Sequence, residues 1–182
     1  MARHRAAGLP AELLPQSGAR QALLELAQAG RLASCGVVVL ACHGASVQGD
    51  APGRSFVQLG ADRLEASAIE QIRLRADMVM LVACCSGQRA VGGMDLPFWP
   101  GDDFFGLQAA LWRAGARQVV GALWNADVDA AASMAETIHA HWLRGASAAE
   151  AVHQGAQRLV RRPIHLFNHN WATFVATVFG RK

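Results

Sequence analysis

Two short apolar runs, each ending in cysteine, constrain the fold of this chain more than any other feature. Residues 37–42 read VVVLAC and are followed by His43, and residues 78–84 read MVMLVAC and are followed by a second cysteine, Cys85. Such a run, broken at its end by small residues, is typical of a strand buried on both faces of a parallel sheet. Parallel neighbours end at the same edge, where open α/β sheets place their sites. If these strands are adjacent, His43 lies close to Cys84.

A thiol beside an imidazole is a combination suited to nucleophilic catalysis. The thiolate is the attacking group, and an imidazole with a pKa of about 6.5 can take up and return the proton. We therefore interpret Cys84 as a nucleophile and His43 as its partner. Two other interpretations stay open: a cysteine that ends a buried strand is often a small core residue, and Cys42 and Cys85 could join the pair in a zinc site, although adjacent ligands on straight strands diverge.

Composition places the chain in a broad class and argues against others. With 182 residues, 52% of them hydrophobic, it can form one domain with a sizeable core. We expect a loose lead-in over residues 1–16 and a single domain over residues 17–182. The 17 basic and 14 acidic residues form no polybasic region, so nucleic acid is not an expected partner. No apolar run approaches the ~20 residues that cross a bilayer. The four cysteines show no disulfide framework, and a cytoplasmic location is expected.

The pattern of apolar residues and breakers predicts strands that alternate with helices. This order predicts an α/β domain of three layers, with a mainly parallel central sheet flanked by helices. Asp102 or Asp103 is expected to cap the third helix, and residues 86–101 form a long loop of a kind that is usually functional. The predicted strands are residues 36–42, 55–60, 78–84, 118–124 and 171–179. The predicted helices are residues 17–29, 67–73, 102–113, 127–144 and 147–161.

Four motifs, in order along the chain, carry a resemblance to a known family. They are ACHG at 41–44, LVAC at 81–84, GDDFFGL at 101–107, and AGAR followed closely by VVGALW within 114–124. Together they resemble the CHAT domain, the caspase-like domain associated with tetratricopeptide repeats, which is related to separases and caspases. The resemblance extends from about residue 17 to residue 179.

The resemblance implies a caspase-like fold and a cysteine endopeptidase without a cofactor or metal. His43 and Cys84 fall on the catalytic dyad of the family. The backbone N–H groups of Gly44 and Cys84 would form the oxyanion hole. Cys85 occupies a position where the family commonly has glutamate or another polar residue. The alternation of a strand would turn Cys85 away from the face of Cys84, which favours a core or supporting role for it.

The resemblance also suggests where substrate binds. The turn that holds Asn125 and Asp127 lies where caspase-like relatives build the pocket for the residue before the scissile bond, and separase-like relatives place an acid there to hold arginine. Asp102 and Asp103 would approach from across the cleft. We therefore expect a pocket for a basic residue. The simpler alternative is that Asp127 and Asp102 only cap their helices.

Relatives commonly carry tetratricopeptide repeats, and these 182 residues contain none. We therefore expect a protein substrate. We also expect a regulatory partner or upstream sensor, for instance a tetratricopeptide-repeat protein, that acts in trans or from another part of the protein. Two alternatives to an active peptidase remain. One is a catalytically inactive caspase-like module that binds a protein partner. The other is a thiol redox sensor using Cys84 and Cys85, which is disfavoured because neighbouring cysteines form a strained disulfide.

Overall fold

The central sheet of the protein is built from the predicted apolar strands. The structure, a computed structural model, describes residues 10–47, 54–87 and 106–178. Its four-stranded sheet has the order β1-β5-β6-β7. Strand β5 pairs in parallel with β1 on one side and β6 on the other, and β7 runs antiparallel to β6. The prediction of a mainly parallel sheet is therefore confirmed. The strands are β1 Val37–Ala41, β5 Met78–Val82, β6 Gln118–Ala122 and β7 Phe174–Val178.

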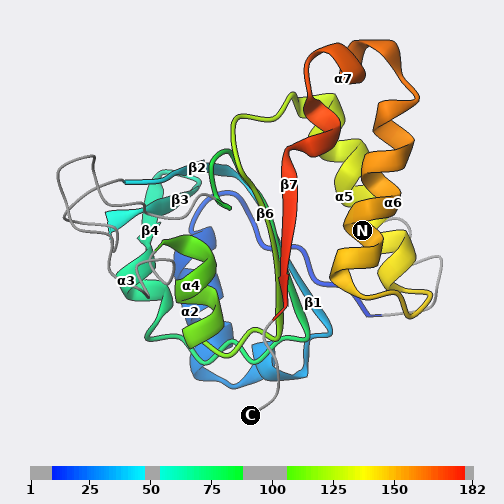
Figure 1. The fold of residues 1–182 in the computed structure, drawn as a ribbon. Helices are drawn as coiled ribbons and strands as arrows, with labels where there is room; N and C mark the ends of the chain where they lie inside the picture. Colours follow the sequence, from blue (N-terminus) through cyan, green and yellow to red (C-terminus); the bar gives the residue numbers. More distant parts are fainter. Residues whose placement is uncertain (1–9, 48–53, 88–105, 179–182) are drawn as a thin grey trace, which may run out of the picture.

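Helices cover both faces of this sheet (Figure 1). In β5, Val79 and Leu81 face a core shared with α2 and α4, while Met78 and Met80 face a second core shared with α5 and α6. All four side chains are fully buried, because a central strand between two helical layers has no solvent-exposed face. The three-layer caspase-like arrangement is thus confirmed. The helices are α2 Ala19–Gln28, α4 Leu107–Arg113, α5 Val128–Trp142 and α6 Ala148–Val160.

A second, antiparallel sheet follows β1 and was predicted only in part. Its order is β2-β3-β4, and only β3 has a counterpart among the predicted strands. Strand β2 begins directly after the predicted strand at 36–42 and was not predicted. The strands are β2 His43–Ala45, β3 Phe56–Leu59 and β4 Asp62–Glu65. The shorter elements are α3 Ala66–Ile69, α7 Pro163–Phe167 and the 3-10 helices Arg31–Ser34 and Asn170–Ala172.

Helix ends explain most differences from the predicted boundaries. Helix α4 begins at Leu107. The residue before it, Gly106, has a φ of +110°, a positive value that glycine adopts more readily than other residues. The predicted cap, Asp102 or Asp103, lies outside the described residues. The predicted capping box is present at α6, where the Ser147 side chain accepts from the Glu150 backbone and Glu150 accepts from the Ser147 backbone. The Glu150 carboxylate accepts hydrogen bonds from the Ser147 backbone N–H and, second in effect, from the Ser147 hydroxyl, and these bonds hold the pKa of Glu150 below its ordinary value.

Candidate active site

The two cysteine-terminated strands lie side by side, as the sequence suggested. In the parallel pairing of β1 with β5, Ala41 stands opposite Val82. The Cys42 backbone N–H donates to the Val82 carbonyl oxygen at 3.3 Å, which carries the ladder one residue further. His43 and Cys84 come directly after this last bond on their respective strands. The sheet therefore delivers both residues to the same carboxyl edge.

Gly44 makes the close contact between the two chain segments. A Cβ atom built on Gly44 would lie 3.0 Å from the Cys84 carbonyl oxygen and 3.1 Å from the Ala83 Cβ. Both distances are shorter than ordinary van der Waals contact. The backbone after His43 thus packs directly on the backbone of Cys84. A Cβ atom at this position would require the neighbouring atoms to shift by a few tenths of an ångström, so the close approach favours glycine.

His43 and Cys84 are both reachable from solvent. His43 begins β2 and is exposed, and its backbone is placed by antiparallel pairing with Gln58 of β3. Cys84 is half-buried and its thiol is free. Within the described residues no hydrogen bond joins the His43 ring to the Cys84 sulfur. Such bonds are often long in enzymes without substrate and shorten when substrate binds.

Ser86 anchors the turn that carries Cys84. Its fully buried hydroxyl donates to the Ala83 carbonyl oxygen at 2.7 Å and accepts from the Ala122 N–H at 3.0 Å. The Gly87 N–H donates to the Ala122 carbonyl oxygen at 2.7 Å. These bonds fix both ends of the turn against β6. The sequence did not identify this role for Ser86, although a small polar residue just after a buried strand is a signal for such an anchor.

Cys85 lies in the turn and contacts the segment after β6. Strand β5 ends at Val82, so strand alternation does not reach Cys85, and the core or supporting role expected for it stays a prediction. Its φ of +55° places it in the left-handed region. The half-buried thiol donates to Asn125 Oδ1 at 3.3 Å. Burial, and then the charge of a neighbouring Cys84 thiolate, raise the pKa of Cys85, which lowers its thiolate fraction near neutral pH.

Cys42 and Cys35 have structural surroundings. Both are half-buried and pack against the core on the α2 side of the sheet. Burial raises the pKa of Cys42 to about 11, and a backbone hydrogen bond at Gln58 offsets part of that effect. A thiol with so high a pKa is almost entirely protonated at neutral pH. Cys42 is therefore unsuited to act as the nucleophile.

Comparison with protein families agrees with this arrangement. The family model of the CHAT domain matches residues 2–181, nearly the whole chain. The chain belongs to the CHAT domain family. The family is one of caspase-like proteins, which accords with the fold and with the place of the two strand ends. A comparison with curated proteins finds no match.

The residues that we expected to bind substrate in this CHAT domain differ in where they lie and in what they contact. Asn125 contacts Cys85 and therefore lies beside the candidate nucleophile turn. Asp127 caps α5: its Oδ1 accepts from the N–H groups of Asp129 and Ala130 at 3.0 and 3.1 Å. Its other carboxylate oxygen makes no hydrogen bond within the described residues. Asp102 and Asp103 lie outside the described residues, as does most of the loop expected at 86–101.

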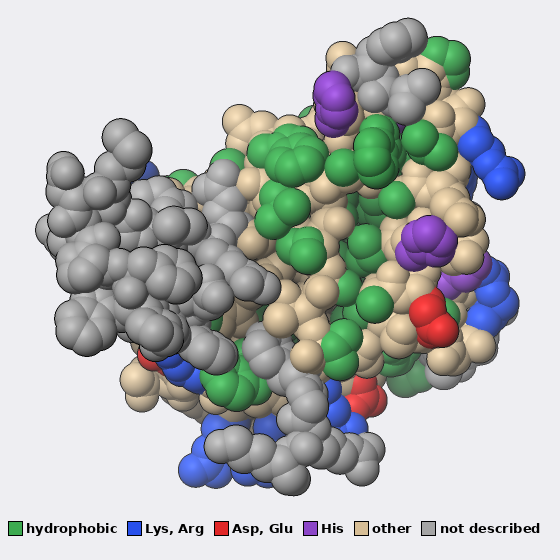
Figure 2. All heavy atoms as spheres, in the orientation of Figure 1, with side chains coloured by type: hydrophobic (Ala, Val, Ile, Leu, Met, Phe, Trp, Pro, Cys, Tyr) green, Lys and Arg blue, Asp and Glu red, His purple; other side chains and the backbone are tan. Residues whose placement is uncertain are grey.

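The described part of this CHAT domain contains neither a cluster of metal ligands nor a membrane-spanning helix. No group of three or more His, Cys, Asp or Glu side chains in that part could hold a metal ion. None of its helices is both long and apolar enough to cross a bilayer. Figure 2 shows that hydrophobic side chains are spread over the face around β7, whereas arginines lie along the outer edge of the α5–α6 layer.

Proposed function

We propose that this CHAT domain is a cysteine endopeptidase that cleaves a protein substrate with Cys84 as nucleophile and His43 as acid–base partner. One observation carries the proposal: the backbone of Gly44 packs on the backbone of Cys84. This contact brings the residue after His43 against the candidate nucleophile itself, at the edge where α/β sheets hold their sites. The exposed imidazole and the half-buried thiol are accessible to a peptide.

The chemistry follows from the properties of the two groups. The Cys84 sulfur attacks the carbonyl carbon of the scissile bond and forms an acyl-enzyme, while the proton passes to His43 and from there to the leaving amine. Water then hydrolyses the thioester. The backbone N–H groups of Gly44 and Cys84 would stabilise the oxyanion, and one such donor contributes about 3–4 kcal/mol to the transition state. Cys85 is a weaker candidate because its thiol is bonded to Asn125 and its pKa is raised.

The proposal includes a preference for a basic residue before the scissile bond. Asn125 lies beside the nucleophile turn, and Asp127 is exposed two residues later with one carboxylate oxygen outside its helix cap. A carboxylate so placed is free to pair with a guanidinium or ammonium group. Asp102 and Asp103 belong to the same proposal on the basis of the family resemblance alone.

Three variants test the proposed nucleophile. Cys84→Ala and His43→Ala should each abolish cleavage of arginine-terminated peptide reporters, because one removes the attacking atom and the other removes proton transfer. Cys85→Ala should retain most of the activity. Thermal melts of all three variants show whether the fold is retained. Activity that survives Cys84→Ala and disappears with Cys85→Ala would show that Cys85, and not Cys84, is the nucleophile. Cleavage of only acidic or apolar reporters would contradict the pocket for a basic residue.

An upstream sensor or a protein partner, for instance a tetratricopeptide-repeat protein, is proposed to switch the activity on. The family resemblance supports such a switch, because relatives of the CHAT domain commonly carry tetratricopeptide repeats. The reporter assay is therefore run with and without products of neighbouring genes. Activity that is full in the isolated chain and unchanged by every candidate partner would contradict this part of the proposal.

A second candidate function is a catalytically inactive module that binds a protein. The specific observation in its favour is apolar surface near the nucleophile turn, where the side chains of Trp124 and Val128 are 38% and 80% exposed. Exposed apolar side chains at one site are typical of interaction surfaces. A cysteine-reactive peptide trap separates the two functions, because an active dyad is labelled at one thiol and an inactive module is not.

A further inference from the structure

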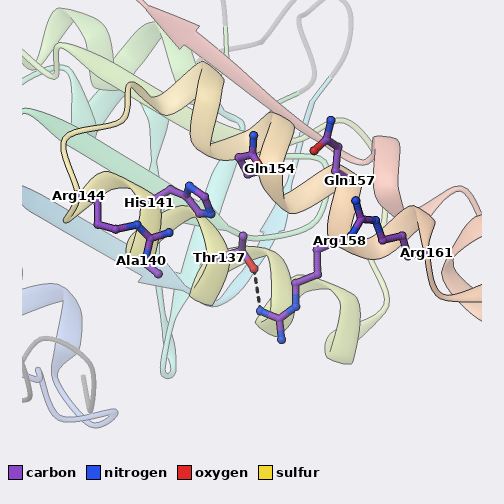
Figure 3. Close-up of a pocket in the computed structure, with 8 residues that line it drawn as sticks. All are labelled: Thr137, Ala140, His141, Arg144, Gln154, Gln157, Arg158 and Arg161. Carbon is purple, nitrogen blue, oxygen red and sulfur yellow. Dashed lines mark hydrogen bonds between the residues drawn. The ribbon is translucent and has the colours of Figure 1, made fainter.

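A second concave site lies between α5 and α6, away from the candidate active site. The cavity has a volume of about 280 Å³, and three arginines contribute to its wall: Arg158 on α6, Arg161 at the C-cap of that helix, and Arg144 just after the end of α5. Figure 3 shows that the lining side chains come from these two facing helices. Its α5 residues begin at Thr137, ten positions after the helix cap at Asp127, which at 1.5 Å per residue is a separation of roughly 15 Å.

The charge of this cavity is not compensated by the protein. No carboxylate is among the described residues that line it. None of its three arginines forms an ion pair within the described part of the chain, whereas Arg113 and Arg117 elsewhere pair with Glu70 and Asp77. The three guanidinium groups thus give the wall of this cavity a positive charge, and an anion bound there would be attracted to it.

Arg158 is held in place by a neutral group. Its Nη1 donates to the Thr137 hydroxyl oxygen at 3.0 Å, across the two helices (Figure 3). Thr137 is buried and its hydroxyl donates in turn to the Ser133 carbonyl oxygen at 2.8 Å. The guanidinium is thus oriented before any ligand binds, and it keeps its whole charge and its other N–H donors. Such preorganisation reduces the entropy lost on binding.

The other lining groups indicate what kind of anion fits. His141, Gln154 and Gln157 add further polar groups to the wall, and no Trp or Phe is present there to stack on a nucleobase. The volume of about 280 Å³ lies just below that of typical small-molecule sites, which run from about 300 to 1,000 Å³. Planar guanidinium groups bind phosphate oxygens through paired hydrogen bonds. We propose that the α5–α6 cavity binds a compact soluble anion carrying two phosphate groups, with Arg144, Arg158 and Arg161 as its ligands.

Pyrophosphate is the probe that tests this site, with binding measured by titration calorimetry on the full chain at fixed ionic strength. Wild type should bind one equivalent. Arg158→Gln and Arg144→Gln should each weaken binding about tenfold or more, because each removes a charge-assisted hydrogen bond. Arg162→Gln is the matched control: it removes the same charge from an exposed neighbour that does not line the cavity, and it should change the affinity less than about twofold.

Each other result overturns the proposal. Equal weakening by Arg162→Gln would show attraction to net charge alone. Equal affinity for citrate would show that phosphate is not selected, and tighter binding of a phosphoserine peptide than of pyrophosphate would point to a protein ligand. Absence of saturable binding to wild type would remove the site altogether. Melting curves of the variants in the absence of ligand show whether a loss of binding is caused by unfolding. If Arg158→Gln unfolds, Arg158→Lys replaces it in the test, because lysine retains the positive charge.

Discussion

Ser86 connects the candidate nucleophile to the rest of the protein. Its hydroxyl satisfies one donor of β6 and one acceptor of the nucleophile turn, and the side chain is fully buried. A buried polar group that loses its partner costs more free energy than the hydrogen bond itself contributes. The geometry at Cys84 therefore depends on a neighbour that does not take part in the proposed chemistry.

Ser86→Ala should destabilise the protein and disturb the site. It leaves the Ala122 N–H without its partner, so the free energy of unfolding should fall by about 1–3 kcal/mol, and Tm should fall by several degrees. Ser34→Ala is the control, since its hydroxyl bonds the Arg31 carbonyl oxygen at an exposed position, and it should change stability by less than about 0.5 kcal/mol. Equal stability of the two variants in urea would show that the turn is not anchored in this way.

The four thiols should differ in their reaction with iodoacetamide, because only the thiolate reacts. Burial raises the pKa of Cys42 to about 11, so its alkylation should be slow at neutral pH and should accelerate as the pH rises toward that value. The pKa of Cys85 is also raised, so its alkylation near neutral pH should be slower than that of an unperturbed thiol. Peptide mapping by mass spectrometry at several pH values measures all four rates. Fast neutral-pH labelling of Cys42 would contradict the burial that the structure shows.

Contacts between residues far apart in the sequence were the part of the candidate site that could not be predicted. Apolar runs predicted the edge at which His43 and Cys84 lie, because buried parallel strands have a clear pattern. The bond from Cys85 to Asn125 joins residues 40 positions apart, and no local pattern encodes it. Strand alternation does not place Cys85, because β5 ends at Val82 and the turn that follows has its own geometry.

Among the elements, the long helices and central strands were predicted within a few residues, and the short pieces were not. Helices α5 and α6 carry side-chain caps, Asp127 and Ser147, that define their starts in the sequence. Helix α4 has no side-chain cap and begins after a glycine. Strand β2 has only three residues, and its pairing with β3 rather than its own sequence makes it a strand. Tertiary contacts decide such elements.

Asp127 at the start of α5 allows its two proposed roles to be separated. Asp127→Asn keeps a side-chain oxygen to cap the helix and removes the charge, so stability should stay within about 0.5 kcal/mol of wild type. Asp127→Ala removes the cap and should cost about 0.5–2 kcal/mol. If the carboxylate also pairs with a basic substrate residue, Asp127→Asn should lose most of the preference for arginine over neutral reporters in kcat/KM. An unchanged preference would leave capping as its only role.

For the whole molecule, the two cores on either side of the sheet explain how one chain holds the proposed site. Val79 and Leu81 of β5 pack in the core on the α2–α4 side, and Met78 and Met80 pack in the core on the α5–α6 side. A strand held on both faces is a rigid support for the residue at its end. The second sheet, by contrast, carries His43, which is exposed, on a strand of three residues. We therefore place the nucleophile on the rigid part of the molecule and its partner on the part better able to move.

The most direct test of the account is covalent trapping. The full chain, with any activating partner found in the reporter assay, is treated with an arginine-terminated peptide acyloxymethyl ketone, and the modified residue is located by mass spectrometry. We predict one adduct, on Cys84, whose formation is abolished or strongly slowed by His43→Ala and unaffected by Cys85→Ala. An adduct on Cys85, or labelling of Cys84 at the same rate with and without His43, would contradict the proposed dyad.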